Sequence, residues 1–203
     1  MKCFSLIKLN FLFENTTNEQ KIAVVPGSFK PPHKGHYEMI KHYSKLVGPS
    51  GKVLVFVSSP SAKSERKTHD GKVISPELAK RILEIYCKSL GNVQIEIANG
   101  SSVRECYSIG KRFNSGTLIF GCSKKDNDIV RFEKIKSYIE ERNPDLTVID
   151  PSTTAVDVTS TEDGYISATN FRNVYGNPEE MVKFLPDHLS NKTKQKIINL
   201  MLN

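Results

Sequence analysis

The sequence predicts an α/β fold: a Rossmann-like, doubly wound parallel sheet of five strands, followed by short C-terminal helices. Apolar runs of strand length alternate with amphipathic segments of helix length along most of the 203 residues. Parallel strands need long crossover connections, which are usually helices that cover the sheet. The alternation therefore predicts a parallel sheet with helices on both faces.

Each predicted element rests on a local pattern. The predicted strands are the apolar runs at 22–26, 52–58, 93–98, 116–121 and 145–150. The helical patterns between them lie at 35–47, 76–90, 102–113 and 126–142, and further helices are predicted near 178–185 and 191–202. Ser75 and Ser190 are predicted N-caps, and Pro76 takes the first helical position after Ser75.

Two polar segments interrupt this rhythm, at 59–74 and 151–165. Both follow the carboxyl ends of strands, so we expect them at the edge of the sheet where ligands bind. We predict an N-terminal extension at residues 1–20, one domain at 21–175 and a C-terminal helical appendage at 176–203.

The charge balance favours an anionic ligand. Lys and Arg total 29 against 22 acidic residues, a formal net charge of +7, which suits nucleotide phosphates or nucleic acid, or else a basic solvated surface. The four cysteines show no paired spacing, so we expect neither a zinc site nor a disulfide framework, and a cytoplasmic location. No signal peptide or membrane span is predicted.

The most informative segment is 26–36, Pro-Gly-Ser-Phe-Lys-Pro-Pro-His-Lys-Gly-His, directly after the first apolar run. A strand that ends in such a turn before a helix brings backbone N–H groups and two imidazoles together, where they can hold a polyphosphate. Gly27 permits close backbone approach, and Gly35 leaves space between His33 and His36. These histidines can stabilise charge that develops during phosphoryl transfer. The alternative is a capped helix with two surface histidines.

A second segment, Ile166-Ser-Ala-Thr-Asn-Phe-Arg172, resembles the start of an anion-binding helix. Ser167 and Thr169 offer hydroxyl groups, and Arg172 offers a planar fork for phosphate one turn later. Taken alone, this segment is only a capped helix. Lys34 is a further candidate, because both of its histidine neighbours in the first segment are expected to face the ligand.

Together the two segments resemble the nucleotidylyltransferase superfamily, whose signatures are a T/S-F-x-P-x-H-x-G-H turn and a later I-S-x-T-x-x-R helix start. The resemblance covers roughly residues 21–175. It implies transfer of a nucleoside monophosphate from a nucleoside triphosphate to a phosphate-bearing acceptor, with release of pyrophosphate and no covalent intermediate. It also implies Mg²⁺ bound through the nucleotide phosphates, with no metal ligand from the chain.

The resemblance also assigns residues. Ser28 and the two histidines would contact the triphosphate, while Ser167, Thr169 and Arg172 would hold the departing β- and γ-phosphates. The candidate catalytic residues are His33, Lys34, His36 and Arg172. The candidate nucleotide-binding residues are Gly27, Ser28, Phe29, Gly35, Ser167 and Thr169.

The substrates are marked less clearly. The first segment is nearest to nicotinamide mononucleotide adenylyltransferases, which favours ATP. Residues 161–164 faintly resemble a cytidylyltransferase pattern, although its arginine is absent and Ser160 stands near that place, so CTP is the alternative. The acceptor phosphate could meet the basic residues Lys63, Arg66, Lys67 and Lys72, or the segment 121–126.

Two other classes of protein share part of this pattern. A class I aminoacyl-tRNA synthetase fragment shares the histidine turn, but 203 residues leave no room for a tRNA-binding domain. A catalytically inactive nucleotide- or nucleic-acid-binding module should have lost phosphate ligands, whereas both segments are intact. An enzyme is therefore expected, with a nucleic-acid partner not expected and a homo-oligomer left open.

Overall fold

The computed structural model describes residues 20–59, 65–124, 128–157, 160–161 and 164–203. At its centre lies a sheet of five parallel strands in the order β3-β2-β1-β4-β5. These strands are β1 (Lys21–Gly27), β2 (Lys52–Val57), β3 (Val93–Ile97), β4 (Gly116–Phe120) and β5 (Leu146–Val148). The strand order reverses at β1 and β4, and that switch point is where open parallel sheets bind ligands. The predicted fold class is confirmed.

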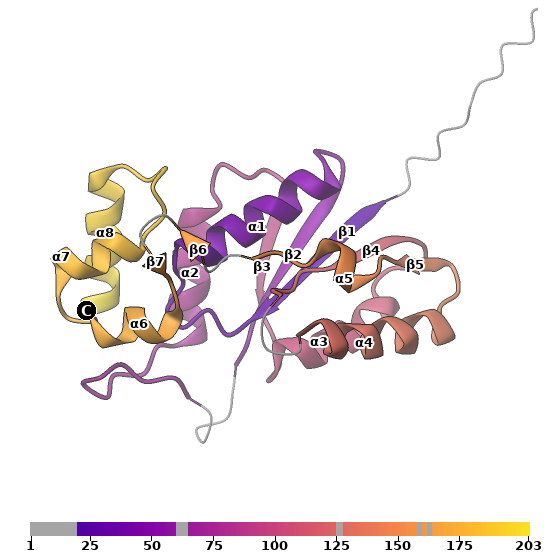
Figure 1. Cartoon of the computed structure of the whole chain (residues 1–203), viewed down its shortest axis with the longest axis horizontal. Helices are drawn as coiled ribbons and strands as arrows, with labels where there is room; N and C mark the ends of the chain where they lie inside the picture. The colour runs from indigo at the N-terminus through magenta and orange to yellow at the C-terminus, as the bar shows by residue number, and fades with distance from the viewer. Residues whose placement is uncertain (1–19, 60–64, 125–127, 158–159, 162–163) are drawn as a thin grey trace, which may run out of the picture.

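Helices cover both faces of this sheet. They are α1 (Lys34–Val47), α2 (Pro76–Tyr86), α3 (Ser102–Ser108), α4 (Asp128–Arg142), α5 (Pro151–Thr154), α6 (Ala168–Asn173), α7 (Pro178–Met181) and α8 (Asn191–Leu202). Figure 1 shows α3 and α4 on one side of the sheet, α1 on the other, and α6 to α8 gathered at one end beside α2. In the part of the chain that the structure describes, every helix is too short or too polar to cross a bilayer.

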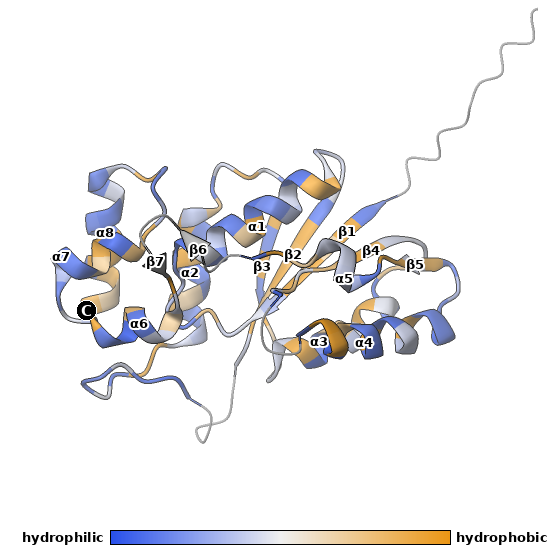
Figure 2. Ribbon diagram, viewed as in Figure 1, coloured by the Kyte–Doolittle hydropathy of each residue, from blue (hydrophilic) through white to orange (hydrophobic). Residues whose placement is uncertain are grey.

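The alternation of side chains along the central strands explains the two covered faces. In β1, Ala23 and Val25 pack into the core under α1 and α2, while Ile22 and Val24 pack into the core under α3 and α4. All four are fully buried. A strand buried on both faces must be apolar at every position, and Figure 2 shows the strands as the most continuously hydrophobic part of the ribbon.

Several predicted boundaries differ from the structure. The helix expected at 76–90 ends at Tyr86, and the helix expected at 102–113 becomes α3 followed by a 3-10 turn at Ile109–Lys111. The segment 151–165, expected to be a loop, contains α5 and the short antiparallel pair β6 (Ser160–Thr161) and β7 (Gly164–Tyr165). Asp150 caps α5 by accepting a hydrogen bond from the Ser152 N–H at 2.8 Å.

The C-terminal segment shares the core of the sheet. Met181, Leu185, Ile197, Ile198 and Met201 belong to the same buried cluster as the β1 side chains beneath α1. Lys72 caps the end of α8, since its Nζ donates to the carbonyl oxygens of Met201 at 2.9 Å and Leu202 at 2.8 Å. Helix carbonyl groups thus hold the Lys72 ammonium group in this structure, and its contact with an acceptor phosphate stays a prediction.

Tyr43 connects α1 to the carboxyl end of the sheet. Its hydroxyl donates to the Thr154 carbonyl at 2.8 Å and accepts from the Cys122 N–H at 3.2 Å, and the side chain is fully buried. We expect Tyr43→Phe to lower the free energy of unfolding by about 1–3 kcal/mol, because it leaves both backbone groups buried without that partner. Urea unfolding would measure the change.

Tyr107→Phe is the matched control, since this tyrosine is 36% exposed on α3. Its effect should stay within about 0.5 kcal/mol. If the two variants unfold at the same urea concentration, the Tyr43 hydroxyl is not holding α1 to the sheet.

Candidate nucleotide-binding site

A cavity of about 390 Å³ opens at the carboxyl ends of the strands, on the side of the switch point. Its walls come from the turn after β1, the ends of β2 and β4, the start of α3, the first turns of α4, and the segment that leads into α6. The lining residues are Pro26 to Phe29, His33, His36, Met39, Ser58, Ser101 to Val103, Gly121 to Ser123, Asp128, Arg131, Phe132 and Ile166 to Ala168.

The turn after β1 has a shape that depends on Gly27 and Phe29. A Cβ atom on Gly27 would lie 2.6 Å from Cζ of Phe29, because the ring folds back over that glycine. Phe29 has φ of 52°, in the left-handed region that side chains other than glycine rarely adopt. Its ring meets His36 edge-on at 4.9 Å between centroids. The buried Phe29 ring thus fixes the path of the turn and supports His36.

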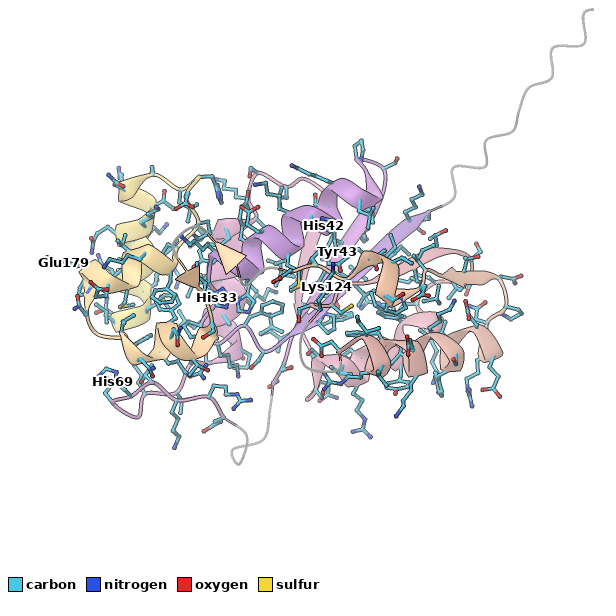
Figure 3. All side chains as sticks on the ribbon, in the orientation of Figure 1. His33, His42, Tyr43, His69, Lys124 and Glu179 are labelled. Atoms are coloured by element: carbon cyan, nitrogen blue, oxygen red, sulfur yellow. The ribbon has the colours of Figure 1, made fainter. Side chains whose placement is uncertain are left out.

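The two histidines form a stacked pair at the start of α1, with ring centroids 3.7 Å apart and planes inclined by 27°. Figure 3 shows His33 at this end of the helix and His42 further along it. The backbone N–H of His33 donates to Nδ1 of His36 at 3.2 Å. Nδ1 of His36 is therefore unprotonated, and the proton of the neutral ring sits on Nε2, which makes Nε2 a hydrogen-bond donor.

Burial determines the charge of this pair. It lowers the pKa of His33 to about 3. It also lowers the pKa of His36 to well below the usual range, and the neighbouring His33 adds to the effect. Nδ1 of His33 is buried and, among the described residues, has no hydrogen-bond partner. Both rings are accordingly neutral at physiological pH.

Arg172 joins the two sequence segments directly. Its Nη1 donates to the Lys30 carbonyl oxygen at 2.8 Å, and its Nη2 donates to Oγ1 of Thr169 at 2.9 Å. Burial lowers the pKa of Arg172, and the nearby Arg66 adds repulsion, yet a guanidinium stays protonated in proteins. Bonds to described residues use two of its five N–H donors, so the guanidinium has further donors with which it can bind a ligand.

The structure brings most of the predicted residues to one place. His33, His36, Gly27, Ser28, Phe29 and Ser167 all line the cavity. Ser167 is the N-cap of α6, and its Oγ accepts from the Asn170 N–H at 3.1 Å. The described walls of the cavity do not include Lys34, Gly35, Thr169 or Arg172. Lys34 and Gly35 are buried in the first turn of α1, while Thr169 is exposed.

The cavity also contains residues that were not among the predicted site residues. Ser58 follows β2, and its Oγ donates to Oγ of Ser102 at 2.7 Å and accepts from the Ser102 N–H at 3.1 Å. Asp128 and Arg131 of α4 also line the cavity, and they form an ion pair at 3.0 Å. The sequence does contain a signal for these residues. They follow the carboxyl ends of β2, β3 and β4, and such positions border the ligand site in this fold.

Charged residues of the basic loop lie near this site: Glu65 acts on the pKa of Lys30, and Arg66 acts on that of Arg172. Arg66 is close enough to Arg172 to affect its pKa, and both lie near the turn after β1 on the α6 side. Lys63 lies outside the described residues. Among the described residues, no group of three or more His, Cys, Asp or Glu side chains could hold a metal ion.

The comparisons with known proteins agree with this geometry. A phosphopantetheine adenylyltransferase of Leuconostoc mesenteroides subsp. mesenteroides is 30% identical over 92 residues, which are 45% of this chain and 51% of that protein. The aligned part thus spans about half the length of that relative. The model of the family described as cytidylyltransferase-like matches residues 24–191, a range that contains both sequence segments and all of the sheet except the first residues of β1. The chain belongs to the cytidylyltransferase-like family of the nucleotidylyltransferase superfamily.

Proposed function

We propose that the chain is a nucleotidyltransferase that transfers a nucleoside monophosphate from a nucleoside triphosphate to a phosphate-bearing small molecule and releases pyrophosphate. One observation carries the proposal. Arg172 of the second segment bonds the Lys30 carbonyl of the first at 2.8 Å, and the histidine pair and Ser167 face the same cavity. The two segments that we propose to bind phosphate thus meet at one site, through a bond between residues 142 positions apart.

The reaction would be a direct displacement. An oxygen of the acceptor phosphate attacks the α-phosphorus and forms a new P–O bond. The bond between the α-phosphorus and the oxygen that bridges to the β-phosphate breaks, and its electron pair leaves with pyrophosphate. The acceptor is already an anion at neutral pH, so the site needs no general base. Its task is to position the two substrates and stabilise the transferred charge.

The histidines would act as neutral hydrogen-bond donors. The backbone N–H of His33 donates to Nδ1 of His36, so the ring proton of His36 is on Nε2 and can be donated to a phosphate oxygen. Donors that are already in place when charge develops contribute much to catalysis. The positive charge would come instead from Arg172, with Arg66 close to it.

The α6 side would hold the departing phosphates. Ser167 lines the cavity, and because its oxygen already accepts the Asn170 N–H, its own hydrogen remains to donate. Arg172 retains donors that are not used by Lys30 and Thr169. We assign Ser167, Thr169 and Arg172 to the β- and γ-phosphates.

ATP is the favoured nucleotide. The similarity of the first segment to adenylyltransferases supports this choice, as does the name of the relative from Leuconostoc, a phosphopantetheine adenylyltransferase. CTP is the alternative. We propose that Mg²⁺ is bound through the nucleotide phosphates, where it would neutralise charge on the triphosphate. This fits a described cavity wall whose one carboxylate, Asp128, is paired with Arg131.

We expect pyrophosphate release when the protein is incubated with Mg²⁺, ATP and a panel of phosphorylated acceptors, with CTP, GTP and UTP in parallel. A coupled phosphate assay would measure release. Absence of release with every pair, together with tight and salt-sensitive binding to RNA or DNA, would favour the binding-module alternative.

His36→Ala should lower kcat/KM by about 100-fold or more, because it removes a donor aimed at the triphosphate. The matched control is His42→Ala on the same helix, where the side chain is exposed. That variant should keep the parental rate. Equal rates for the parent and His36→Ala would show that the imidazole does not act on the phosphates.

The buried neutral histidines should make the free protein acid-sensitive. The pKa of His33 is about 3 in the folded chain against 6.5 as the ordinary value, so between these pH values only the unfolded chain takes up this proton. The stabilising contribution is present above pH 6.5 and is lost as pH falls toward 3. It amounts to about 1 kcal/mol per pH unit.

His33→Gln removes this proton uptake. Urea unfolding of the parent and the variant from pH 7 to pH 4 should therefore give different slopes of stability against pH, with the steeper loss in the parent. Parallel curves would mean that His33 is not held neutral by burial.

A further inference from the structure

A second cavity lies away from the nucleotide-binding site, between α2, the turn that follows it and the start of α8. It has a volume of about 720 Å³, which is within the range of small-molecule sites. We call it the α2–α8 groove. Its lining residues are Arg81, Glu84, Ile85, Tyr86, Lys88, Ser89, His188, Leu189, Ser190, Thr193 and Lys196.

The charge of this groove is positive. Arg81 lies on α2, Lys88 in the turn after it, and Lys196 opposite them on α8. None of these three cations forms an ion pair with an acid in the described part of the chain. Glu84 is the acidic residue of the lining, and it faces Lys80 at 3.8 Å. A concave surface with three uncompensated cations attracts an anion.

The groove also borders the N-terminus of α8 and has an apolar wall. Ser190 caps α8, and its Oγ accepts the Thr193 N–H at 3.2 Å. The positive end of the α8 dipole therefore points toward the same space as the cations. Ile85 and Leu189 provide apolar contact. This combination fits a small molecule that has a phosphate at one end and a less polar body.

The wall of the groove is connected to the turn that holds the histidine pair. His188 lies with Nε2 at 3.1 Å from the Tyr86 carbonyl oxygen, and its ring stacks on Tyr37 at 4.2 Å between centroids. Tyr37 directly follows His36. The Tyr86 hydroxyl donates to the Pro32 carbonyl oxygen at 3.1 Å, and the Tyr86 side chain is fully buried. His188 is therefore connected to the nucleotide turn through Tyr37 and Tyr86.

We propose that the α2–α8 groove is a second binding site, which takes a small phosphate-bearing molecule and transmits its occupancy to the turn that carries His33 and His36. Binding of an anion in the groove does not depend on nucleotidyl transfer. Regulation of transfer by the occupied groove does depend on it, and so rests on the proposed function. Arg81, Lys88 and Lys196 would hold the phosphate, and His188 would sense it.

The five histidines of the chain are separate reporters for an NMR titration. With inorganic pyrophosphate as the probe, the ring signals of His33 and His36 report the nucleotide-binding site, and those of His188 report the groove. The signal of His42, exposed on α1, is the internal reference. In the parent we expect the His188 signals to shift with a saturable midpoint of their own.

Lys196→Glu and Arg81→Glu should weaken the pyrophosphate affinity at His188 by about tenfold or more, because each places a negative charge beside the anion. The affinity at the nucleotide-binding site should stay within about twofold. The matched control is Lys194→Glu, which makes the same charge change on α8 outside the groove lining. It should leave both titrations as in the parent.

Transmission predicts that the His36 signal in the parent moves in two steps, the second at the midpoint of His188, and that Lys196→Glu removes only this second step. The binding proposal is overturned if His188 does not move, or if it moves with the same midpoint in the parent and in Lys196→Glu. A single-step titration of His36 in the parent overturns the transmission. The readout involves no turnover, so a protein without pyrophosphate release would still give a clear answer.

Discussion

The hydrogen bond from the Arg172 guanidinium to the Lys30 carbonyl is the constraint on which the rest of the site depends. It connects the turn after β1 to α6 across 142 residues at a distance of 2.8 Å. The donor is charged and partly buried, so this bond is stronger than one between neutral groups. A second contact of α6 is with the loop that leads to α2, where Nδ1 of His69 lies 3.4 Å from the Arg172 carbonyl oxygen. These two contacts, together with the packing of the buried Phe171 in the core under α1, set the separation between the histidine pair and Ser167.

The histidine pair costs the free protein stability, and that cost is informative. Two imidazoles are stacked at the end of a strand, both neutral, and Nδ1 of His33 has no partner among the described residues. A buried polar atom without a hydrogen bond is unfavourable. A sequence selected only for stability would place apolar side chains there. The proposed function gives a reason to keep imidazoles at this position, because in that proposal the Nε2–H of His36 donates to a phosphate oxygen.

The parts of this molecule that follow from the sequence are those set by local pattern. The apolar runs around Val24 and Val55 predicted the buried strands, and the Gly-His turn predicted the place of the cavity. The Ser58–Ser102 pair and the bond from Arg172 to Lys30 could not be predicted, because they depend on the distance between segments far apart in the chain. Lys72 illustrates the limit most clearly. Its charge and its place in the basic loop are those expected of a phosphate ligand. In the fold, however, its ammonium group donates to the last carbonyl groups of α8.

The chain beyond residue 175 matters for the site, because it packs against the elements that carry the site residues. The turn after β1 is supported on one side by the sheet, and the described support on its other side includes Tyr86, which also contacts His188. Phe171 of α6 stacks on Phe184 at 4.8 Å, so α6 rests on the same C-terminal segment. Phosphoryl transfer depends on positioning within fractions of an ångström. A strand, a turn and a six-residue helix do not provide such rigidity alone, whereas a common core that extends through Ile197 and Met201 does.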